Sequence, residues 1–390
     1  MHVTPYQDDV FLPESYRDIE KQVKANDIII VASTGSKTII GKAGYIDSVL
    51  DNTQIGAFLR IIRPLFAEIV PYIKLVFATK YYMDYISNQS GGTNINNIKT
   101  EHVAKLLIPI PSLSEQERVA FRVKNLFSKL DIIDSNQSDI ETLYDELKKR
   151  TLDLAIRGKL VPQDENDEPA SELLKRIRAE KKAQLGKKYV DSYIYKGDDN
   201  YYYEHIDRKA KDEAIEVPFD LPDNWCYARI ETLVNLLTDG THSTPKYTTN
   251  GIPFISVKDL STGILSFEST KFISIEEHRK LSKRCNPCKG DILLTKVGTT
   301  GIPVLVDTEK EFSLFVSVAL LKFDSSYINS EFFIFLLKSP LVQEQAAENT
   351  RGVGNKNWVL SDINKTLVVL PPLAEQRRIV NKINEIFAKL

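Results

Sequence analysis

Short polar loops carry most of the side chains in this sequence that could bind a ligand or do chemistry. Two loops are rich in Gly and Asn: SGGTNINNI at 90–98 and RGVGNKNWV at 351–359. Two more, at 33–38 and 296–300, lie between short β-rich runs, as in the turn of a hairpin. Asn can pair bidentately with adenine, and Lys or Arg with guanine, in the major groove of DNA. These loops are therefore candidate base-contacting segments.

The candidate DNA contacts lie mainly in the second half of the chain. In that half they are Thr241, His242, Thr244, Lys246, Lys258, Lys296, Thr299, Thr300, Arg351, Asn355, Lys356 and Asn357. Weaker equivalents in the first half are Ser33, Thr34, Ser36, Lys37, Asn94 and Asn96. The alternative for any one of them is that a Gly/Asn/Thr cluster is simply a turn.

Patterns that could indicate catalysis or a metal site are weak. Glu115-Gln116 and Glu375-Gln376 could be read as catalytic carboxylates, but in the first turn of a helix they are expected to act as capping and dipole partners. Cys285 and Cys288 form a lone CxxC, whereas structural zinc needs four ligands. STGSKT at 33–38 lacks the order and spacing of a P-loop. We predict no catalytic residue, metal or cofactor in this chain.

Two similar modules must position these loops. LIPIPSLSEQERVAFRVKNLFSKL, ending at Leu130, is repeated as LVVLPPLAEQRRIVNKINEIFAKL, ending at Leu390. The spacing is 260 residues throughout, too long for a solenoid repeat of about 20–50 residues. Each half reads as hairpin, aromatic helix, Gly/Asn loop, short strand, Pro-rich turn and long helix. The chain therefore performs one task twice.

Composition narrows the class of protein. The 390 residues suggest two domains or slightly more, and a hydrophobic content of 42% is enough to form cores. Three Cys cannot make a disulfide framework, which favours the cytoplasm. We expect no membrane contact, because no apolar run approaches the ~20 residues of a spanning helix. The net charge of −2 means that DNA binding would require a local basic patch.

A long helix is predicted from Ser114, as the N-cap, to Arg157, a length of about 65 Å. Its apolar seam steps alternately by four and three residues, a heptad pattern that needs a partner helix. That seam comprises Leu126, Leu130, Ile133, Gln137, Ile140, Tyr144, Leu147, Thr151 and Leu154. The segment 161–220 is interpreted as a linker with a basic helix, extended or disordered over 189–217. The basic run from Lys175 to Lys188 either neutralises phosphates or is a solvated helix face.

Taken together, these motifs resemble the specificity subunit of type I restriction-modification systems. The resemblance rests on PxLxEQxR at 111–118 and 371–378, LAIRGKLVPQ at 154–163, EPASELLKRIRAEKKAQ at 168–184, LPDNW at 221–225 and GIPFISVKDL at 251–260. It covers essentially the whole chain. It implies an α+β fold in which two similar α/β target recognition domains are joined by long conserved helices packed as an antiparallel coiled coil.

The resemblance also implies a division of labour. Each recognition domain would read one half of a split site in double-stranded DNA. The helices would dock methyltransferase subunits, with Glu115, Gln116, Arg118, Glu375, Gln376 and Arg378 as docking residues. Restriction subunits would complete the complex. S-adenosylmethionine, ATP and Mg would be bound by those partners.

The resemblance predicts five segments: recognition domain 1 at 1–112, a long helix at 113–160, the linker at 161–220, recognition domain 2 at 221–372, and the start of a second helix at 373–390. Measured against the family pattern, the first domain and the second helix look incomplete. A second copy of the chain could then supply a partner helix. The alternative reading is a silent cassette that acts only as an assembly fragment.

Overall fold

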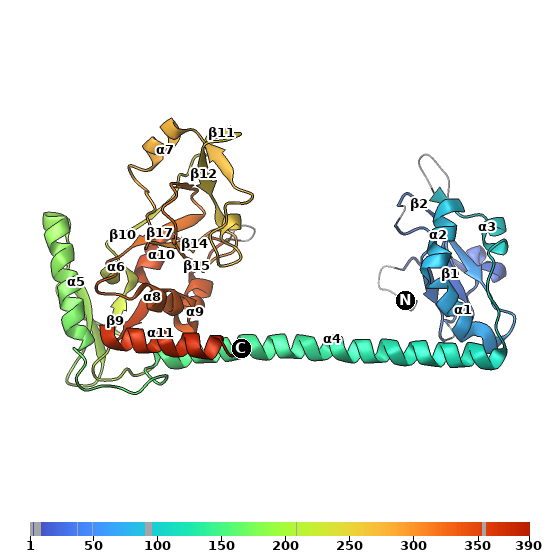
Figure 1. The fold of residues 1–390 in the computed structure, drawn as a ribbon, viewed down its shortest axis with the longest axis horizontal. Helices are drawn as coiled ribbons and strands as arrows, with labels where there is room; N and C mark the ends of the chain where they lie inside the picture. The colour runs from blue at the N-terminus through green and yellow to red at the C-terminus, as the bar shows by residue number, and fades with distance from the viewer. Residues whose placement is uncertain are drawn as a thin grey trace. The chain divides into compact units, whose positions relative to one another are not determined.

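A computed structural model (Figure 1) describes residue 3 and residues 9–36, 38–48, 50–89, 96–207, 209–352 and 356–390, with the side chain of Asn96 left out. The chain forms two compact units, residues 1–139 and 140–390. Both mix helices with small sheets, as predicted. No helix in the described ranges is long and apolar enough to cross a membrane.

Unit 1 is built on a three-stranded antiparallel sheet of order β3-β1-β4. Its strands are β1 (Ile28–Val31), β2 (Ser33–Thr34), β3 (Ala43–Tyr45), β4 (Leu59–Ile62) and β5 (Asn96–Asn97). Its helices are η1 (Glu14–Tyr16), η2 (Ile19–Lys21), η3 (Ala67–Ile69), α1 (Val70–Phe77), α2 (Lys80–Gln89) and α3 (Thr100–Ala104).

Strand β1 forms the centre of unit 1 because its residues are buried on both faces of the sheet. Ile28 and Ile30 face one way and share a core with Phe77, Tyr82 and other residues of the helical layer. Ile29 faces the opposite side and packs in a smaller cluster with Val23 and Ile46. Alternation of side chains along a strand explains this division.

Helix α4 (Leu113–Ile156) is continuous over 44 residues, about 66 Å. It begins after Ser112, whose carbonyl accepts the amides of Glu115 and Gln116, so the predicted N-cap at Ser114 is wrong by two residues. The boundary between the two units falls inside this helix. Much of its predicted seam is exposed: Leu126, Leu130, Ile133, Ile140 and Leu147.

The described residues of unit 2 form four sheets, of orders β10-β17-β14-β15, β11-β13-β12-β16, β18-β9 and β6-β7-β8. Its strands are β6 (Ser192–Lys196), β7 (Tyr202–Ile206), β8 (Glu213–Ile215), β9 (Cys226–Arg229), β10 (Leu236–Asp239), β11 (Tyr247–Thr248), β12 (Ile252–Ile255), β13 (Lys271–Ile273), β14 (Ile292–Thr295), β15 (Pro303–Leu305), β16 (Ser313–Leu314), β17 (Val318–Lys322) and β18 (Leu367–Leu370). All pairs are antiparallel except β12–β16.

The helices of unit 2 are mostly short. They are α5 (Ala170–Leu185), η4 (Gly186–Lys188), α6 (Ile230–Leu233), η5 (Val257–Asp259), α7 (Ile275–Leu281), α8 (Ser330–Lys338), α9 (Pro340–Asn349), α10 (Leu360–Lys365) and α11 (Leu373–Phe387). Two begin at side-chain caps. Ser274 accepts the amide of Glu277 at the start of α7, and Asn329 accepts that of Phe332 at the start of α8.

The segment predicted as a linker, 161–220, is instead part of the folded unit. Leu173 and Ile177 of α5, with Ile194 and Tyr202 of the β6-β7-β8 sheet, lie in the same core as Trp225. The tyrosines read as a disordered stretch alternate along paired strands, with Tyr195 opposite Tyr203. The interpretation as a linker was wrong because it weighed the charges in this segment above a period-two aromatic pattern.

Helix α11 runs antiparallel to the last turns of α4 within unit 2 (Figure 1). Leu152 and Ile156 of α4 share a core with Ile379 and Ile383 of α11. The predicted antiparallel pairing of the two helices is therefore present over these turns.

The two units repeat one backbone design, as predicted. Asp27 and Asp291 each accept, through Oδ2, the amide three residues earlier, Lys24 or Cys288, at 2.7 Å in both units. Each also forms an ion pair with a cation of a neighbouring strand region. Asp27 pairs with Arg63, directly after β4, and Asp291 pairs with Lys322, in β17. Strands β3-β1-β4 thus correspond to β15-β14-β17.

Candidate nucleic-acid interface

The hairpin loop and the Gly/Asn loop of unit 2 lie against each other. The amide of Gly298 donates to the Lys356 carbonyl at 2.9 Å, and that of Trp358 donates to the Lys296 carbonyl at 2.8 Å. Isolated bridges join Val297 to Asn357 and Arg351 to Asn357. The structure therefore brings together two groups of predicted residues that are separated by about fifty positions in sequence: Thr299 and Thr300 with Arg351, Lys356 and Asn357.

A third predicted segment follows β10. The Thr241 amide donates to the Leu314 carbonyl, and the Val316 amide donates to the Thr241 carbonyl, each at 3.0 Å. These bonds fix the start of the loop, while His242, Thr244 and Lys246 beyond it are exposed. Lys258, in η5 after β12, is also exposed, and its Nζ lies 3.3 Å from the Ser269 carbonyl.

Asp239, at the end of β10, joins these segments. Its carboxylate is 2% exposed and meets cationic or ionisable groups from three places: Arg284 Nη2 at 3.0 Å, Lys296 Nζ at 3.4 Å and His242 Nε2 at 3.3 Å. A buried carboxylate needs such partners. Asp239 thus positions the loop after β10, the segment after α7 and the hairpin loop.

The prediction that Lys296 is an exposed DNA contact is therefore corrected by the structure. It is 4% exposed and its ammonium group points to Asp239, so it does not lie at the surface of the hairpin tip. A lysine that directly follows a buried strand was read as the first residue of an exposed turn. Its ion pair was not visible in the sequence, because Asp239 lies far upstream.

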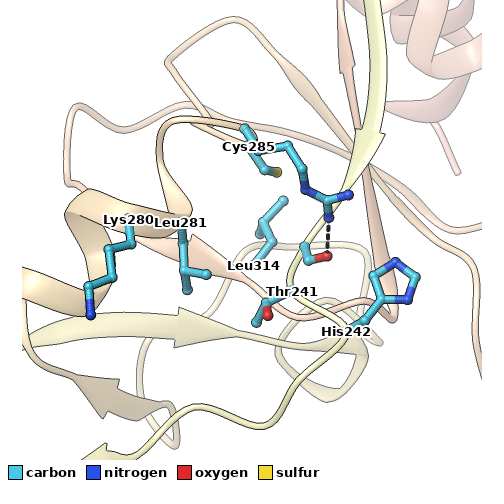
Figure 2. A pocket seen from close by; sticks show the side chains of 8 residues that line it. Thr241, His242, Lys280, Leu281, Cys285 and Leu314 are labelled. Carbon is cyan, nitrogen blue, oxygen red and sulfur yellow. Dashed lines mark hydrogen bonds between the residues drawn. The ribbon is translucent and has the colours of Figure 1, made fainter.

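A small basic cavity of about 240 Å³ opens beside Asp239, lined by Gly240, Thr241, His242, Lys280, Leu281, Arg284, Cys285 and Leu314. Figure 2 shows Thr241 and His242 approaching it from the loop after β10, and Lys280 and Leu281 from α7. The cavity is below the ~300–1,000 Å³ of typical small-molecule sites.

The sequence reading missed the basic segment that contributes Lys280 and Arg284 to the lining of this cavity. Arg279, Lys280 and Lys283 are exposed, and Arg284 donates to the Asp239 and Gly240 carbonyls. The signal was the run HRKLSKR at 278–284, which gives a local basic patch in a chain of net charge −2. It matched no motif, and its closeness to Thr241 and His242 arises only in the fold.

Unit 1 contains the same contact between its hairpin loop and its Gly/Asn loop. Strand β2 pairs with β5, Ser33 opposite Asn97 and Thr34 opposite Asn96. The Ile98 amide donates to the Ala32 carbonyl at 2.7 Å, as Trp358 does to Lys296 in unit 2. Ser36 is half-buried. Lys37, Asn94 and Asn355 lie outside the described residues.

Three of the residues predicted to dock partners are buried. Glu375 and Gln376 have no exposed surface, and Gln116 is 3% exposed. Glu375 accepts the Trp225 indole N–H at 2.8 Å and the Gln163 amide at 2.6 Å. Burial raises the pKa of the Glu375 carboxyl, and these bonds oppose that rise. These three side chains are buried within their own units, Gln116 in unit 1 and Glu375 and Gln376 in unit 2, and are unavailable to a partner.

The remaining predicted docking residues are at the surface. Arg378 is half-buried and paired with Asp167 at 2.6 Å. Glu115 and Arg118, at the equivalent positions of unit 1, are exposed.

The basic run on α5 is largely engaged within the protein. Lys175 pairs with Glu172, Arg176 with Glu168, and Arg178 with Asp191. Lys181 donates to the Glu231 carbonyl, and burial lowers the pKa of its ammonium group. Of the two readings, the structure favours a structural helix face over phosphate neutralisation for these four residues.

The lone CxxC places one thiol inside the protein and one outside. Cys285 is buried, which raises its pKa to about 12, and Cys288 is exposed. Within the described ranges, no three His, Cys, Asp or Glu side chains gather in a way that could hold a metal ion.

Comparison with known proteins gives a consistent family. The model of the type I restriction modification DNA specificity domain matches residues 14–142 and 222–390. The EcoKI specificity subunit of Escherichia coli K12 is 22% identical, with 97% of this chain and 71% of the relative covered. The EcoAI specificity subunit of Escherichia coli is 26% identical, with 96% and 69% covered. A solved structure from work on assembly and conformational transition of the type I R-M system matches with a TM-score of 0.56 and 20% identity, over 94% of this chain and 75% of that one; this last likeness concerns the fold alone.

Proposed function

Because the chain belongs to the type I restriction-modification DNA specificity family, we propose that it is a non-catalytic subunit that selects the DNA sequence on which its partner subunits act. Family membership rests on a match to most of the chain. The chain contributes recognition, and the partners contribute chemistry.

The gathering of polar loops near Asp239 carries this proposal. Asp239 joins the loop at 240–246 to Lys296 of the hairpin loop, and residues 351 and 356–357 lie against that hairpin loop. Lys280 of α7 and Arg284 line a cavity beside the first loop. In protein–DNA interfaces cations hold the phosphates and set register, while side chains in the groove read bases. We assign Arg279, Lys280 and Lys283 to phosphates, and His242, Thr244, Thr299 and Lys356 to the groove.

Unit 1 would read the second half of a split site through its β2–β5 loop pair. Its described residues have the β3-β1-β4 sheet but no counterpart of the β11-β13-β12-β16 sheet or of α7. That difference favours a second candidate function, in which unit 2 alone reads DNA and unit 1 serves in assembly. The two are separated by whether changes in unit 1 alter the sequence selected.

Partner docking would use the exposed seam of α4, since three predicted docking residues are buried. Leu126, Leu130, Ile133, Ile140 and Leu147 are between 45% and 64% exposed. An apolar heptad seam of this kind needs another helix, supplied by a methyltransferase subunit or by a second copy of this chain. Restriction subunits, and binding of S-adenosylmethionine, ATP and Mg by the partners, belong to the same proposal, as does a cytoplasmic location.

A salt titration of DNA binding tests the assignment of Arg279, Lys280 and Lys283 to phosphates. The triple variant Arg279→Ala, Lys280→Ala, Lys283→Ala should bind duplex DNA more weakly. The slope of log affinity against log salt should fall by up to about 0.9 per lost phosphate contact. The matched control removes three exposed lysines of the α5 region, Lys182→Ala, Lys187→Ala and Lys188→Ala. Equal slopes for the two triples would contradict the proposal.

A further inference from the structure

The hairpin between β14 and β15 in unit 2 has a counterpart between β1 and β3 in unit 1. In unit 2 the Gly301 amide donates to the Thr295 carbonyl at 2.8 Å, and in unit 1 the Gly41 amide donates to the Val31 carbonyl at 2.8 Å. Both glycines have left-handed φ angles, 84° and 77°. Gly301 and Gly41 therefore close equivalent hairpin loops, although the loop of unit 1 is four residues longer.

A side chain of helix α9 holds the closing glycine of unit 2. The side-chain amide nitrogen of Gln343 donates to the Gly301 carbonyl at 2.7 Å and to the Leu337 carbonyl, in the last turn of α8, also at 2.7 Å. Because a primary amide has two N–H groups, both donors of this half-buried side chain are used inside the protein. Gln343 thus ties the hairpin loop to the pair of helices α8 and α9.

Unit 1 makes the same contact with a different side chain. Tyr82 of α2 is fully buried, and its hydroxyl donates to the Gly41 carbonyl at 2.9 Å. Helices α1 and α2 correspond to α8 and α9, because the hydroxyls of Thr79 and Ser339 each donate to the carbonyl three residues earlier, at 2.6 Å. In that alignment Tyr82 lies one position before the equivalent of Gln343. The repeat keeps the bond to the closing glycine while the residue that makes it changes.

The tip of the hairpin loop in unit 2 is fixed at both ends. The Gly298 amide donates to the Lys356 carbonyl of the Gly/Asn loop at 2.9 Å. At the other end Gln343 holds the Gly301 carbonyl. The two threonines at 299–300 are the residues between these points. A tip tied in this way has little conformational freedom left to lose when a ligand binds, so its side chains are presented in a set direction.

Given that the units read DNA as proposed above, we propose that Gln343 and Tyr82 are positioning residues for base selection. Each holds the hairpin loop of its own unit at the closing glycine. Each acts through that loop and not by touching DNA, since its polar hydrogens are used inside the protein. Loss of Gln343 leaves the exposed cations Arg279, Lys280 and Lys283 in place. The expected effect is weaker discrimination between base pairs, with the phosphate contacts retained.

The same two helices offer matched controls. Gln345 of α9 also donates to two carbonyls, those of Leu341 and Leu367, each at 2.8 Å, and its side-chain oxygen accepts the Leu367 amide at 2.8 Å. Tyr85 of α2 donates its hydroxyl to the His102 carbonyl at 2.9 Å. These bonds end on β18 and α3, outside the hairpin loops. Gln345→Met and Tyr85→Phe therefore remove comparable bonds without releasing a hairpin loop.

Selection of the full chain against a random pool of DNA duplexes tests the proposal. The parent chain should enrich a motif with two halves. Gln343→Met keeps the length of the side chain but has no N–H, and should reduce the base preference in one half by about fivefold or more, the low end of the usual effect of a mismatch. Tyr82→Phe should do the same in the other half. Gln345→Met and Tyr85→Phe should leave both halves unchanged.

Two measurements separate positioning from a general loss of structure. The slope of log affinity against log salt should equal that of the parent chain in all four variants, because phosphate contacts are retained. Tryptophan fluorescence in urea shows whether unit 2 of each variant is folded, since both tryptophans lie in that unit. If Gln343→Met does not fold, Gln343→Asn replaces it, because asparagine keeps the amide but is one methylene too short to reach both carbonyls.

The possible results distinguish the positioning role from DNA reading itself. A parent chain that enriches no motif refutes both. A parent motif that Gln343→Met and Tyr82→Phe leave unchanged refutes the positioning role alone. An equal loss of preference in Gln345→Met also refutes it, because lost stability would then be the cause. If Gln343→Met acts and Tyr82→Phe does not, the proposal fails for unit 1.

Discussion

Removing the Glu375 carboxylate should destabilise unit 2, whereas the same change at Glu115 should not destabilise unit 1. In Glu375→Ala the Trp225 indole N–H, on a side chain 6% exposed, loses its acceptor. A buried unsatisfied donor costs about 1–3 kcal/mol. Gln163, the other donor to Glu375, is exposed and can turn to water. We therefore expect a loss of about 2 kcal/mol.

Urea unfolding can measure this loss in unit 2 alone. The two tryptophans of the chain, Trp225 and Trp358, both lie in unit 2, so their fluorescence reports its unfolding. With an m-value near the upper end of about 1–3 kcal/mol/M, a loss of about 2 kcal/mol lowers the midpoint by roughly 0.7 M.

The control is Glu115→Ala, followed by far-ultraviolet circular dichroism because unit 1 lacks tryptophan. Surface substitutions usually change stability by no more than about 0.5 kcal/mol. A Glu375→Ala midpoint within roughly 0.2 M of the parent chain would refute the reasoning. So would a Glu115→Ala shift as large as that of Glu375→Ala, because the two glutamates would then have equivalent surroundings.

Three further predictions concern unit 2. Burial raises the pKa of Glu375 above its usual 4.5, so the folded state binds that proton more tightly than the unfolded state. The resulting stability is present below pH 4.5 and is lost as the pH rises through the raised pKa. Glu375→Gln should therefore flatten this part of a plot of the urea midpoint against pH, and a steeper plot would be the contrary result. Asp239→Ala leaves Lys296 buried without its carboxylate and should cost about 3–5 kcal/mol by urea unfolding; a loss below about 1 kcal/mol would show that Lys296 is solvated. Gly240→Ala would place a Cβ 2.0 Å from the Leu314 carbonyl oxygen, so the hydrogen bond from the Thr241 amide to that oxygen should break. Hydrogen exchange of the Thr241 amide should then become faster. An unchanged exchange rate would show that the backbone shifts to accommodate the methyl group without losing this bond.

The repeat was readable from the sequence because it rests on local patterns. Asp27 and Asp291 mark the start of equivalent strands, and the structure gives them the same bond to the amide three residues back. The contact between the hairpin loop and the Gly/Asn loop was harder to predict from the sequence. Each loop was identified, but their pairing in both units depends on the sheet.

The rest of the candidate site depends on contacts between residues that are distant in sequence. Asp239 and Lys296 are 57 positions apart and form a buried pair, so the burial of Lys296 could not be read from the turn-like residues that follow it. Glu375 and Gln376 look like exposed helix-start residues, yet Trp225 and Asn329 cover them. The basic residues after His278 become part of the candidate site only because the fold places α7 beside Thr241.

The most direct test of the central claim is a map of modified adenines in host DNA when this chain is co-expressed with its methyltransferase subunits. The account predicts modification at a split motif with two defined halves. It also predicts that Thr244→Ala with Lys356→Ala, both exposed in the reading loops of unit 2, relaxes one half and leaves the other unchanged. Modification that does not depend on the chain, or a motif unaffected by the double variant, would contradict the claim that these loops select the DNA sequence.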